Sequence, residues 1–134
     1  MDKERVTAYF KSEYPGRNIL SLPEGAEEPM EIICEIEPTS VNPERSVAIV
    51  AIEKSNPHIH SKSIETYEVL EGTVRLFVGI SDIDLAEGDS FQIQPGTVHW
   101  AVGDGEGTIV KVTSVPGWRE EDHILAPWTE RVSE

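Results

Sequence analysis

The sequence contains little that would direct the chain to a membrane, a disulfide framework or a nucleic acid. Its one cysteine, Cys34, excludes an internal disulfide and fits a reducing compartment. No stretch approaches the roughly 20 apolar residues of a membrane span, and residues 1–5 lead into no secretory apolar core. With 11 basic against 25 acidic side chains, the net charge is −14, and nucleic-acid binding needs a basic footprint. We therefore expect a cytoplasmic protein that binds neither nucleic acid nor a membrane.

Glycine and proline, by contrast, are frequent and spread along the 134 residues as punctuation between short apolar runs. Turn signals separate these runs about every 8–12 residues, which is typical of a β-sandwich or barrel. The predicted strands are 30–37, 46–54, two within 58–70, 73–79, 83–86, 90–94, 97–102 and 108–115, with a turn near Ser81 and Asp82. The predicted fold is one all-β domain.

We expect short helical segments at the two ends of the chain, outside the strands of this domain. Residues 2–14 predict a short amphipathic helix with Asp2 as its cap. Its apolar stripe consists of Val6, Tyr9, Phe10 and Tyr14. We divide the chain into a helix and arm (1–29), a barrel (30–115) and a tail that packs on the barrel (116–134). The tail carries Trp118, His123 and Trp128.

The strand at 46–54 is apolar on both faces, which indicates that both are covered. One face would line the barrel interior. The other would pack on a second sheet, on a partner subunit or on the helix and tail of the same chain. The expected assembly is a homodimer. In the strand at 30–37, Ile32, Cys34 and Ile36 share one face, so Cys34 is expected to be buried.

Residues 58–72 carry the most informative pattern. His58 and His60 are two residues apart on a predicted strand, so both imidazoles point to one face. Glu65 begins the next alternating run, which continues with Tyr67 and Val69. Two histidines and a carboxylate suit a borderline divalent cation such as Mn, Fe, Co, Ni or Zn.

The spacing His58-x-His60-x4-Glu65-x6-Gly72 resembles the first motif of the cupin superfamily, and residues 88–99, from Gly88 to His99, resemble the second. The resemblance implies a jelly-roll barrel, the cupin double-stranded β-helix. It also implies a divalent transition metal (Mn, Fe, Ni or Zn) held by His58, His60, Glu65 and His99. The alternation of side chains along a strand agrees with this ligand set, because His99 and Ala101 share one face and Trp100 lies on the other.

Three positions depart from the family pattern without removing a ligand. Ile52 stands where the family has glycine, Pro95 is displaced by one position, and Gly103 stands where an asparagine is usual. His123 lies outside both motifs and is interpreted as a non-ligand.

Three further side chains are candidates for contact with a substrate. Tyr67 shares the face of Glu65, so it is either a hydrogen-bond donor and general acid or a wall aromatic. Lys111 interrupts an apolar strand and would hold an anionic group if it faces inward; otherwise it is an exposed lysine. Either Phe91 with Ile93, or Ser90 with Gln92, lines the pocket.

Residues 63–72 and 112–123 also resemble mannose-6-phosphate isomerase-like cupins, which implies a metal-dependent isomerase or epimerase of a small carbohydrate or sugar phosphate. The alternatives are a metal-dependent dioxygenase of a small organic substrate and a non-catalytic small-molecule binding module. No Arg or Lys cluster lines the motif strands, and Arg75 and Lys62 are the nearest cations. A neutral sugar, or a carboxylate bound directly to the metal, avoids this objection.

Overall fold

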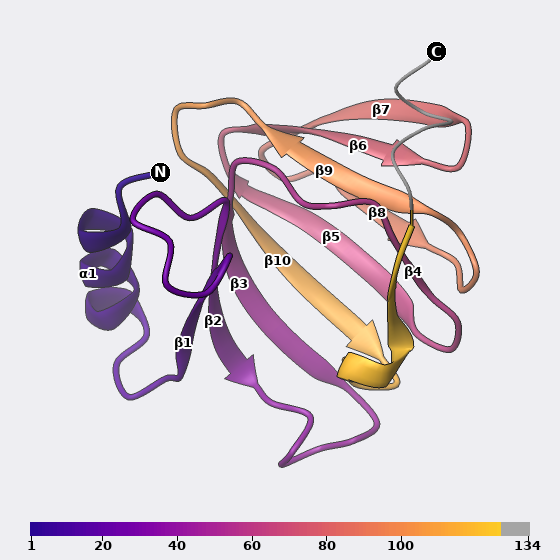
Figure 1. The fold of residues 1–134 in the computed structure, drawn as a ribbon, viewed down its shortest axis with the longest axis horizontal. Coiled ribbons are helices and arrows are strands. Elements are labelled where there is room, and N and C mark those ends of the chain that lie inside the picture. The colour runs from indigo at the N-terminus through magenta and orange to yellow at the C-terminus, as the bar shows by residue number, and fades with distance from the viewer. Residues whose placement is uncertain (127–134) are drawn as a thin grey trace.

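The structure is a computed structural model that describes residues 1–126, so Trp128 and the end of the predicted tail lie outside the described residues. In the described part, one helix precedes two antiparallel sheets (Figure 1). The first sheet has the order β1-β2-β3-β10-β5-β8 and the second the order β11-β4-β9-β6-β7. The elements are α1 (Lys3–Glu13), β1 (Ile19–Leu22), β2 (Glu31–Glu37), β3 (Ser46–Ile52), β4 (His58–His60), β5 (Ile64–Glu71), β6 (Thr73–Val78), β7 (Ser81–Ala86), β8 (Ser90–Ile93), β9 (His99–Gly103), β10 (Thr108–Val115), the 3-10 turn η1 (Glu120–Asp122) and β11 (His123–Leu125).

The two sheets pack face to face and enclose the main core. Strand alternation sends every second side chain between them. The buried members of this interior core are Val50, Ile52, Tyr67, Val69, Val74, Leu76, Leu85, Ile93, Ala101 and Val110. They come from both sheets, which confirms the predicted all-β jelly-roll barrel with a short N-terminal helix.

Helix α1 covers the outer face of the first sheet, as Figure 1 shows beside β1 and β2. The Asp2 carboxylate caps the helix by accepting a hydrogen bond of 3.1 Å from the backbone N–H of Arg5. A second, outer core joins the helix to the sheet; its buried members are Phe10, Ile32, Cys34, Ile49, Ala51 and Ile109. The apolar outer face of β3 is therefore covered by the same chain, and the homodimer stays a prediction.

The predicted turn near Ser81 and Asp82 is wrong by two residues. Gly79 adopts a φ of 60°, so the chain reverses there and Val78 pairs with Ser81. Both ends of the chain also contribute strands. The arm provides β1, which pairs with β2, and the tail provides β11, which pairs with β4. No helix of the described residues is long and apolar enough to cross a membrane.

Gly103 joins the two sheets at one end of the barrel. Its N–H donates a hydrogen bond of 2.8 Å to the carbonyl of Glu53, just after β3. A Cβ at this position would collide with the carbonyl oxygen of Ile52. The close approach of β3 to β9 thus explains why an asparagine would not fit where this chain has glycine.

Candidate metal centre

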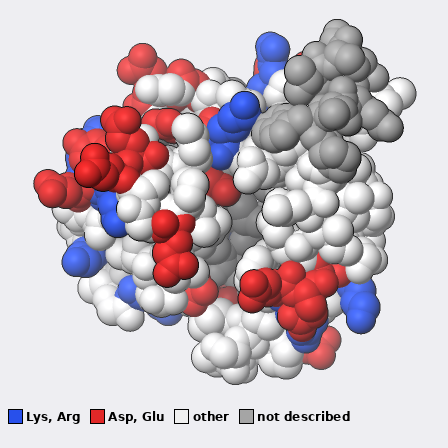
Figure 2. All heavy atoms as spheres, viewed as in Figure 1, with Lys and Arg blue, Asp and Glu red and all other residues white. Residues whose placement is uncertain are grey.

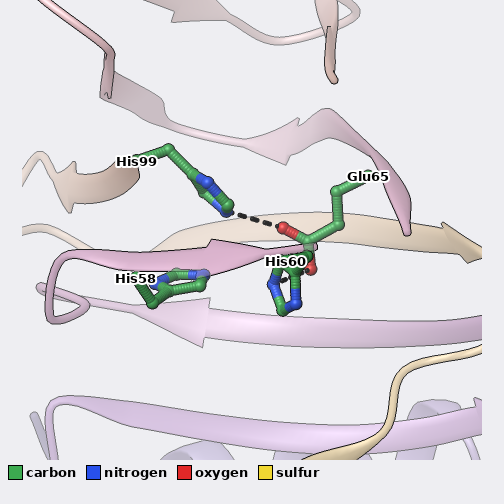
Figure 3. A group of neighbouring side chains, drawn as sticks. All are labelled: His58, His60, Glu65 and His99. Atoms are coloured by element: carbon green, nitrogen blue, oxygen red, sulfur yellow. Dashed lines mark hydrogen bonds and ion pairs between the residues drawn. The ribbon is translucent and has the colours of Figure 1, made fainter. Parts of the chain in front are cut away.

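Four buried side chains from three strands meet between the two sheets. They are His58 and His60 of β4, Glu65 of β5 and His99 of β9, and each is at most 5% exposed. One possible ligand atom from each lies within 4.8 Å of the others. Figure 3 shows His99 and Glu65 pointing toward each other, with the two β4 histidines beside them. The structure therefore brings together all four residues of the two motifs.

Backbone pairing explains how the strands aim these side chains. His58 lies directly opposite His99 in the antiparallel pair of β4 and β9, so their side chains share the inner face. His60 follows by one full pleat on the same face. Glu65 reaches the group from the opposite sheet, because β5 pairs with β10 and β8. The candidate centre therefore depends on both sheets.

The backbone fixes the orientation of each imidazole ring. Each Nδ1 lies within hydrogen-bond distance of a carbonyl oxygen: His58 with Asn56 at 2.7 Å, His60 with Asp122 at 3.2 Å and His99 with Thr97 at 3.0 Å. A carbonyl accepts only, so Nδ1 must carry the proton. In the neutral ring this leaves the lone pair on Nε2, which is the tautomer that a metal ligand needs.

The Nε2 atoms meet the carboxylate of Glu65. Oε1 is 2.9 Å from His99 Nε2 and Oε2 is 3.2 Å from His60 Nε2. His60 Nε2 is buried without a well-directed hydrogen bond among the described residues. If both rings are neutral, acceptor atoms face acceptor atoms, and either a proton or a cation must lie between them. The donor set thus fits a divalent transition metal.

The pKa shifts of Glu65 and His60 reflect the same contact between carboxylate and imidazole. Burial opposes the charge on Glu65, yet its close contacts with His60 and His99 outweigh burial and hold the pKa of Glu65 below its usual range. Burial also opposes charge on His60, but the Glu65 carboxylate raises the pKa of His60. Burial, followed by the neighbouring His99, lowers the pKa of His58 to about 3, so His58 stays neutral.

Asp122, which the sequence does not single out, anchors the turn between β4 and β5. Its carboxylate accepts hydrogen bonds from the Ser61 hydroxyl at 2.6 Å and from the backbone N–H groups of Ser61, Lys62 and Ser63 at 3.0, 3.1 and 3.2 Å. Its own carbonyl oxygen lies against His60. One residue therefore holds both the turn and a ring of the candidate centre.

His123 follows Asp122, so all four histidines of the chain converge on one region. It lies opposite His60 in the pair of β11 and β4, and its ring stacks on His58 with centroids 4.5 Å apart. His123 is not among the four possible ligands. Its position beside them went unpredicted because the only signal was a histidine outside both motifs.

Tyr67 and Phe91 line the interior next to the centre. Tyr67 follows Glu65 by one pleat on β5 and is 5% exposed. Burial, followed by the charges of Glu65 and Glu31, raises the pKa of Tyr67 well above its usual value, so the hydroxyl keeps its proton. Phe91 lies opposite Tyr67 and packs against the interior core, so Phe91 and Ile93 face inward rather than Ser90 and Gln92.

Lys111 lies away from this region. Val110 and Val112 of β10 pack in the interior core, whereas Ile109 packs in the outer core under α1. Alternation places Lys111 on the outer face with Ile109. The geometry is therefore that of a surface lysine, contrary to a substrate contact inside the barrel.

Comparison with known proteins agrees with this architecture. The family model described as "Cupin domain" matches residues 47–116, more than half of the chain. No curated protein matches. Among solved structures, KdgF from Halomonas sp. has a TM-score of 0.65 at 19% identity, over 78% of this chain and 89% of that one.

Two other solved structures are similar. A Streptomyces Pac13 variant with uridine has a TM-score of 0.66 at 17% identity, over 78% of this chain and 84% of that one. A Bacillus subtilis oxalate decarboxylase variant has a TM-score of 0.70 at 14% identity, over 84% of this chain but only 31% of that one. At these identities the likeness concerns the fold alone. Together with the family match, it shows that the chain belongs to the cupin family.

Proposed function

We propose that this cupin is a metal-dependent enzyme that moves a proton on a small neutral carbohydrate, as an isomerase or epimerase. The observation that carries the proposal is the position of Tyr67, whose hydroxyl keeps its proton one pleat from Glu65. His58, His60, Glu65 and His99 would hold the metal. A divalent cation bound there would act as a Lewis acid that polarises a substrate oxygen.

The charges of the chain favour a neutral substrate over a sugar phosphate. No Lys or Arg is buried among residues 1–126. Arg75 is exposed and pairs with Asp84 at 2.8 Å, and Lys111 lies on the outer face. Figure 2 shows acidic side chains on both sides of the hollow near the centre of one face. An anionic group would thus meet negative potential and no buried cation.

In this proposal Tyr67 donates a hydrogen bond to a substrate oxygen, and a water molecule in the site would take the proton from one carbon and return it to the next. Phe91 supplies an apolar wall opposite Tyr67. The raised pKa of Tyr67 favours hydrogen-bond donation over proton transfer, because the phenol is costly to ionise in its buried site. The resemblance to mannose-6-phosphate isomerase-like cupins supports this class of reaction and stays a prediction.

A dioxygenase is the second candidate, favoured by the aliphatic interior of the barrel, which includes Ile93 opposite Glu65 and, farther along the sheet, Val50 and Val69. Apolar walls suit a small organic substrate and oxygen. The similar structures include a nucleoside dehydratase and an oxalate decarboxylase with Mn(II) centres, so this fold supports several chemistries.

The first experiment is elemental analysis of the wild type and His60→Ala, each purified without chelator. We expect about one divalent metal per chain in the wild type and its loss in the variant. Proton NMR in heavy water then tests neutral aldoses for isomerisation and for exchange at the carbon next to the carbonyl. Lys111→Gln is the matched control and should retain both metal and turnover.

The outcomes separate the candidate functions. Manganese or zinc with deuterium incorporation supports the isomerase or epimerase. Iron with oxygen uptake and no exchange supports the dioxygenase. Absence of stoichiometric metal, even after reconstitution, contradicts both enzymes and leaves a small-molecule binding module.

A further inference from the structure

The fourth histidine of the chain, His123, lies beside the candidate metal centre without belonging to it. It begins β11 directly opposite His60 in the antiparallel pair of β11 and β4, so the two side chains share the inner face. Its ring stacks on His58 and meets the ring of His60 edge-on, with centroids 4.5 and 5.4 Å apart. It is outside the set of four residues whose ligand atoms lie within 4.8 Å of one another. A molecule bound at the centre would therefore lie within reach of His123, whereas a cation would have its four ligands without it.

The His123 ring has a hydrogen-bonding atom that no other described residue uses. Its Nδ1 is buried and has no hydrogen-bond partner among residues 1–126. The Nδ1 atoms of His58, His60 and His99, by contrast, each lie against a backbone carbonyl. A buried polar atom without a partner is rare in folded proteins, because it loses its hydrogen bonds to water without replacement. A ligand that supplies the missing hydrogen bond would remove this cost.

Exposure of the aromatic rings increases from the centre toward the edge of the second sheet. The edge strand is β11, which is the yellow strand beside β4 in Figure 1. His60 is 3% exposed, His123 is half-buried and Trp118 is 44% exposed. The centroids of the Trp118 and His123 rings are 5.8 Å apart. His123 thus contacts both a buried ring of the centre and an exposed indole, and a molecule that enters at this edge would meet both aromatic side chains.

Hydrogen bonds of the backbone and of Asp122 hold these two side chains in place. Asp122, the residue before His123, is tied to the turn between β4 and β5 by its carboxylate. The Trp118 N–H donates a hydrogen bond of 2.9 Å to the Ser46 hydroxyl, and its carbonyl accepts one of 2.7 Å from the Thr39 hydroxyl. An imidazole and an indole that are fixed in this way bind a ligand with little further loss of conformational freedom.

We propose that His123 is a specificity-determining residue whose imidazole forms a hydrogen bond with a hydroxyl group of the substrate bound at the centre, while the Trp118 indole packs against the same molecule. The inference rests on the proposed function for the substrate class, a small neutral carbohydrate. It does not require the reaction type. A hydroxyl both donates and accepts, so it fits either nitrogen of a neutral imidazole. An aromatic wall with one well-placed polar group is typical of small-molecule sites.

The experiment uses the full chain loaded with Mn²⁺, as wild type, His123→Phe and His123→Asn. Phenylalanine keeps a ring against His58 but cannot form the hydrogen bond, whereas the asparagine amide places a polar atom close to the position of Nδ1. Ile124→Ala is the matched control, because Ile124 is exposed and alternation places it on the other face of β11. Chelator competition should give a metal affinity within about twofold of the wild type in each variant. In urea, His123→Phe should unfold at the wild-type concentration or above it.

Binding is then measured without turnover, from the faster relaxation of carbohydrate protons near the bound Mn²⁺. The probes are D-glucose, D-mannose, D-galactose and their monodeoxy analogues. We expect His123→Phe to raise the Kd of the bound aldose by about threefold to tenfold, and His123→Asn to stay within about twofold of the wild type. One analogue, which lacks the contacted hydroxyl, should bind the wild type and His123→Phe equally. Trp118→Ala should weaken every aldose and analogue by similar factors, since packing against a ring does not select one hydroxyl.

The two proposals fail in different ways. An aldose that binds near Mn²⁺, binds more weakly to His123→Phe and is never converted supports the role of His123 and contradicts the isomerase or epimerase. Equal Kd values in the wild type and His123→Phe for every probe overturn the role of His123, whether or not an aldose is converted. In the wild type alone, equal affinity for an aldose and all of its monodeoxy analogues, or no binding of any aldose, overturns it as well.

Discussion

The backbone carbonyl of Asp122 lies 3.2 Å from Nδ1 of His60, although the two residues are far apart in the sequence. The contact orients the ring so that Nε2 points to Glu65. The segment after the last barrel strand therefore helps to build the candidate metal centre, and its sequence should matter for metal affinity.

Asp122→Ala should weaken both the fold and the centre. The substitution removes the acceptor of hydrogen bonds from four donor groups, for which we expect a loss of about 2–4 kcal/mol in the free energy of unfolding. Metal affinity should fall by roughly tenfold to a hundredfold, because the ring of His60 loses its support. Denaturant titration and competition with a chelator measure these effects. Glu121→Ala, at an exposed neighbour, is the control; equal metal affinity in both variants would contradict the prediction.

Tyr67→Phe should abolish most turnover and leave the protein folded. The hydroxyl has no hydrogen bond among the described residues, so its removal should change the free energy of unfolding by less than about 1 kcal/mol. Loss of a positioned hydrogen-bond donor to the reacting oxygen typically lowers kcat by about 10²- to 10³-fold. Metal content should stay at the wild-type level. If this variant keeps the wild-type kcat, Tyr67 is only a packing aromatic of the barrel wall.

Phe91→Ala and Lys111→Gln should differ sharply, since the two side chains lie on opposite faces of the first sheet. Removing the Phe91 ring takes away the wall opposite Tyr67, so we expect KM to rise several-fold at unchanged metal content. Lys111→Gln should keep kcat and KM within about twofold. Steady-state kinetics with the aldose that the wild type converts most efficiently measure both effects. A large effect of Lys111→Gln would support a contact between Lys111 and the substrate.

Glu31→Gln should remove a pH dependence from the stability of the metal-free protein. The pKa of Glu31 is raised from 4.5 to about 7 in the folded state, so the folded protein holds this proton at pH values where the unfolded chain has released it. Stability therefore falls as the pH rises from about 4.5 to 7 and levels off above, by at most about 3 kcal/mol.

The variant cannot ionise, so its stability relative to the wild type should increase between pH 5 and pH 8. Urea titrations at both pH values measure the difference, with Glu68→Gln as the control. A difference that does not change with pH would show that the Glu31 carboxyl is well solvated.

Gly103→Ala should destabilise the fold by at least about 2 kcal/mol, because the new methyl group meets the Ile52 carbonyl where β3 joins β9. Thermal unfolding measures the loss. Val102→Ala, on the adjacent half-buried position, should cost less than about 1 kcal/mol. If the two variants unfold alike, the backbone can separate there at little cost.

Most of the strands, the cupin motifs and the convergence of His58, His60, Glu65 and His99 could be predicted from the residues alone, whereas β1 and β11 were not predicted. The predicted features follow from local rules, since neighbouring residues on a strand alternate between faces and motif spacing keeps the ligand-type side chains on one face. The N-terminal helix could also be predicted, because its cap and its apolar stripe lie within a few turns of each other.

The inward faces of β2, β8 and β10 became clear only from the packing of the two sheets. The strand of Lys111 is apolar on both faces because α1 covers one of them, so alternation alone could not orient it. Glu31 likewise shares a strand with two core faces. The positions of Asp122 and His123 depend on the pairing of β11 with β4, a contact between segments some sixty residues apart. Such pairing is decided by the packing of the whole barrel, which no local pattern contains.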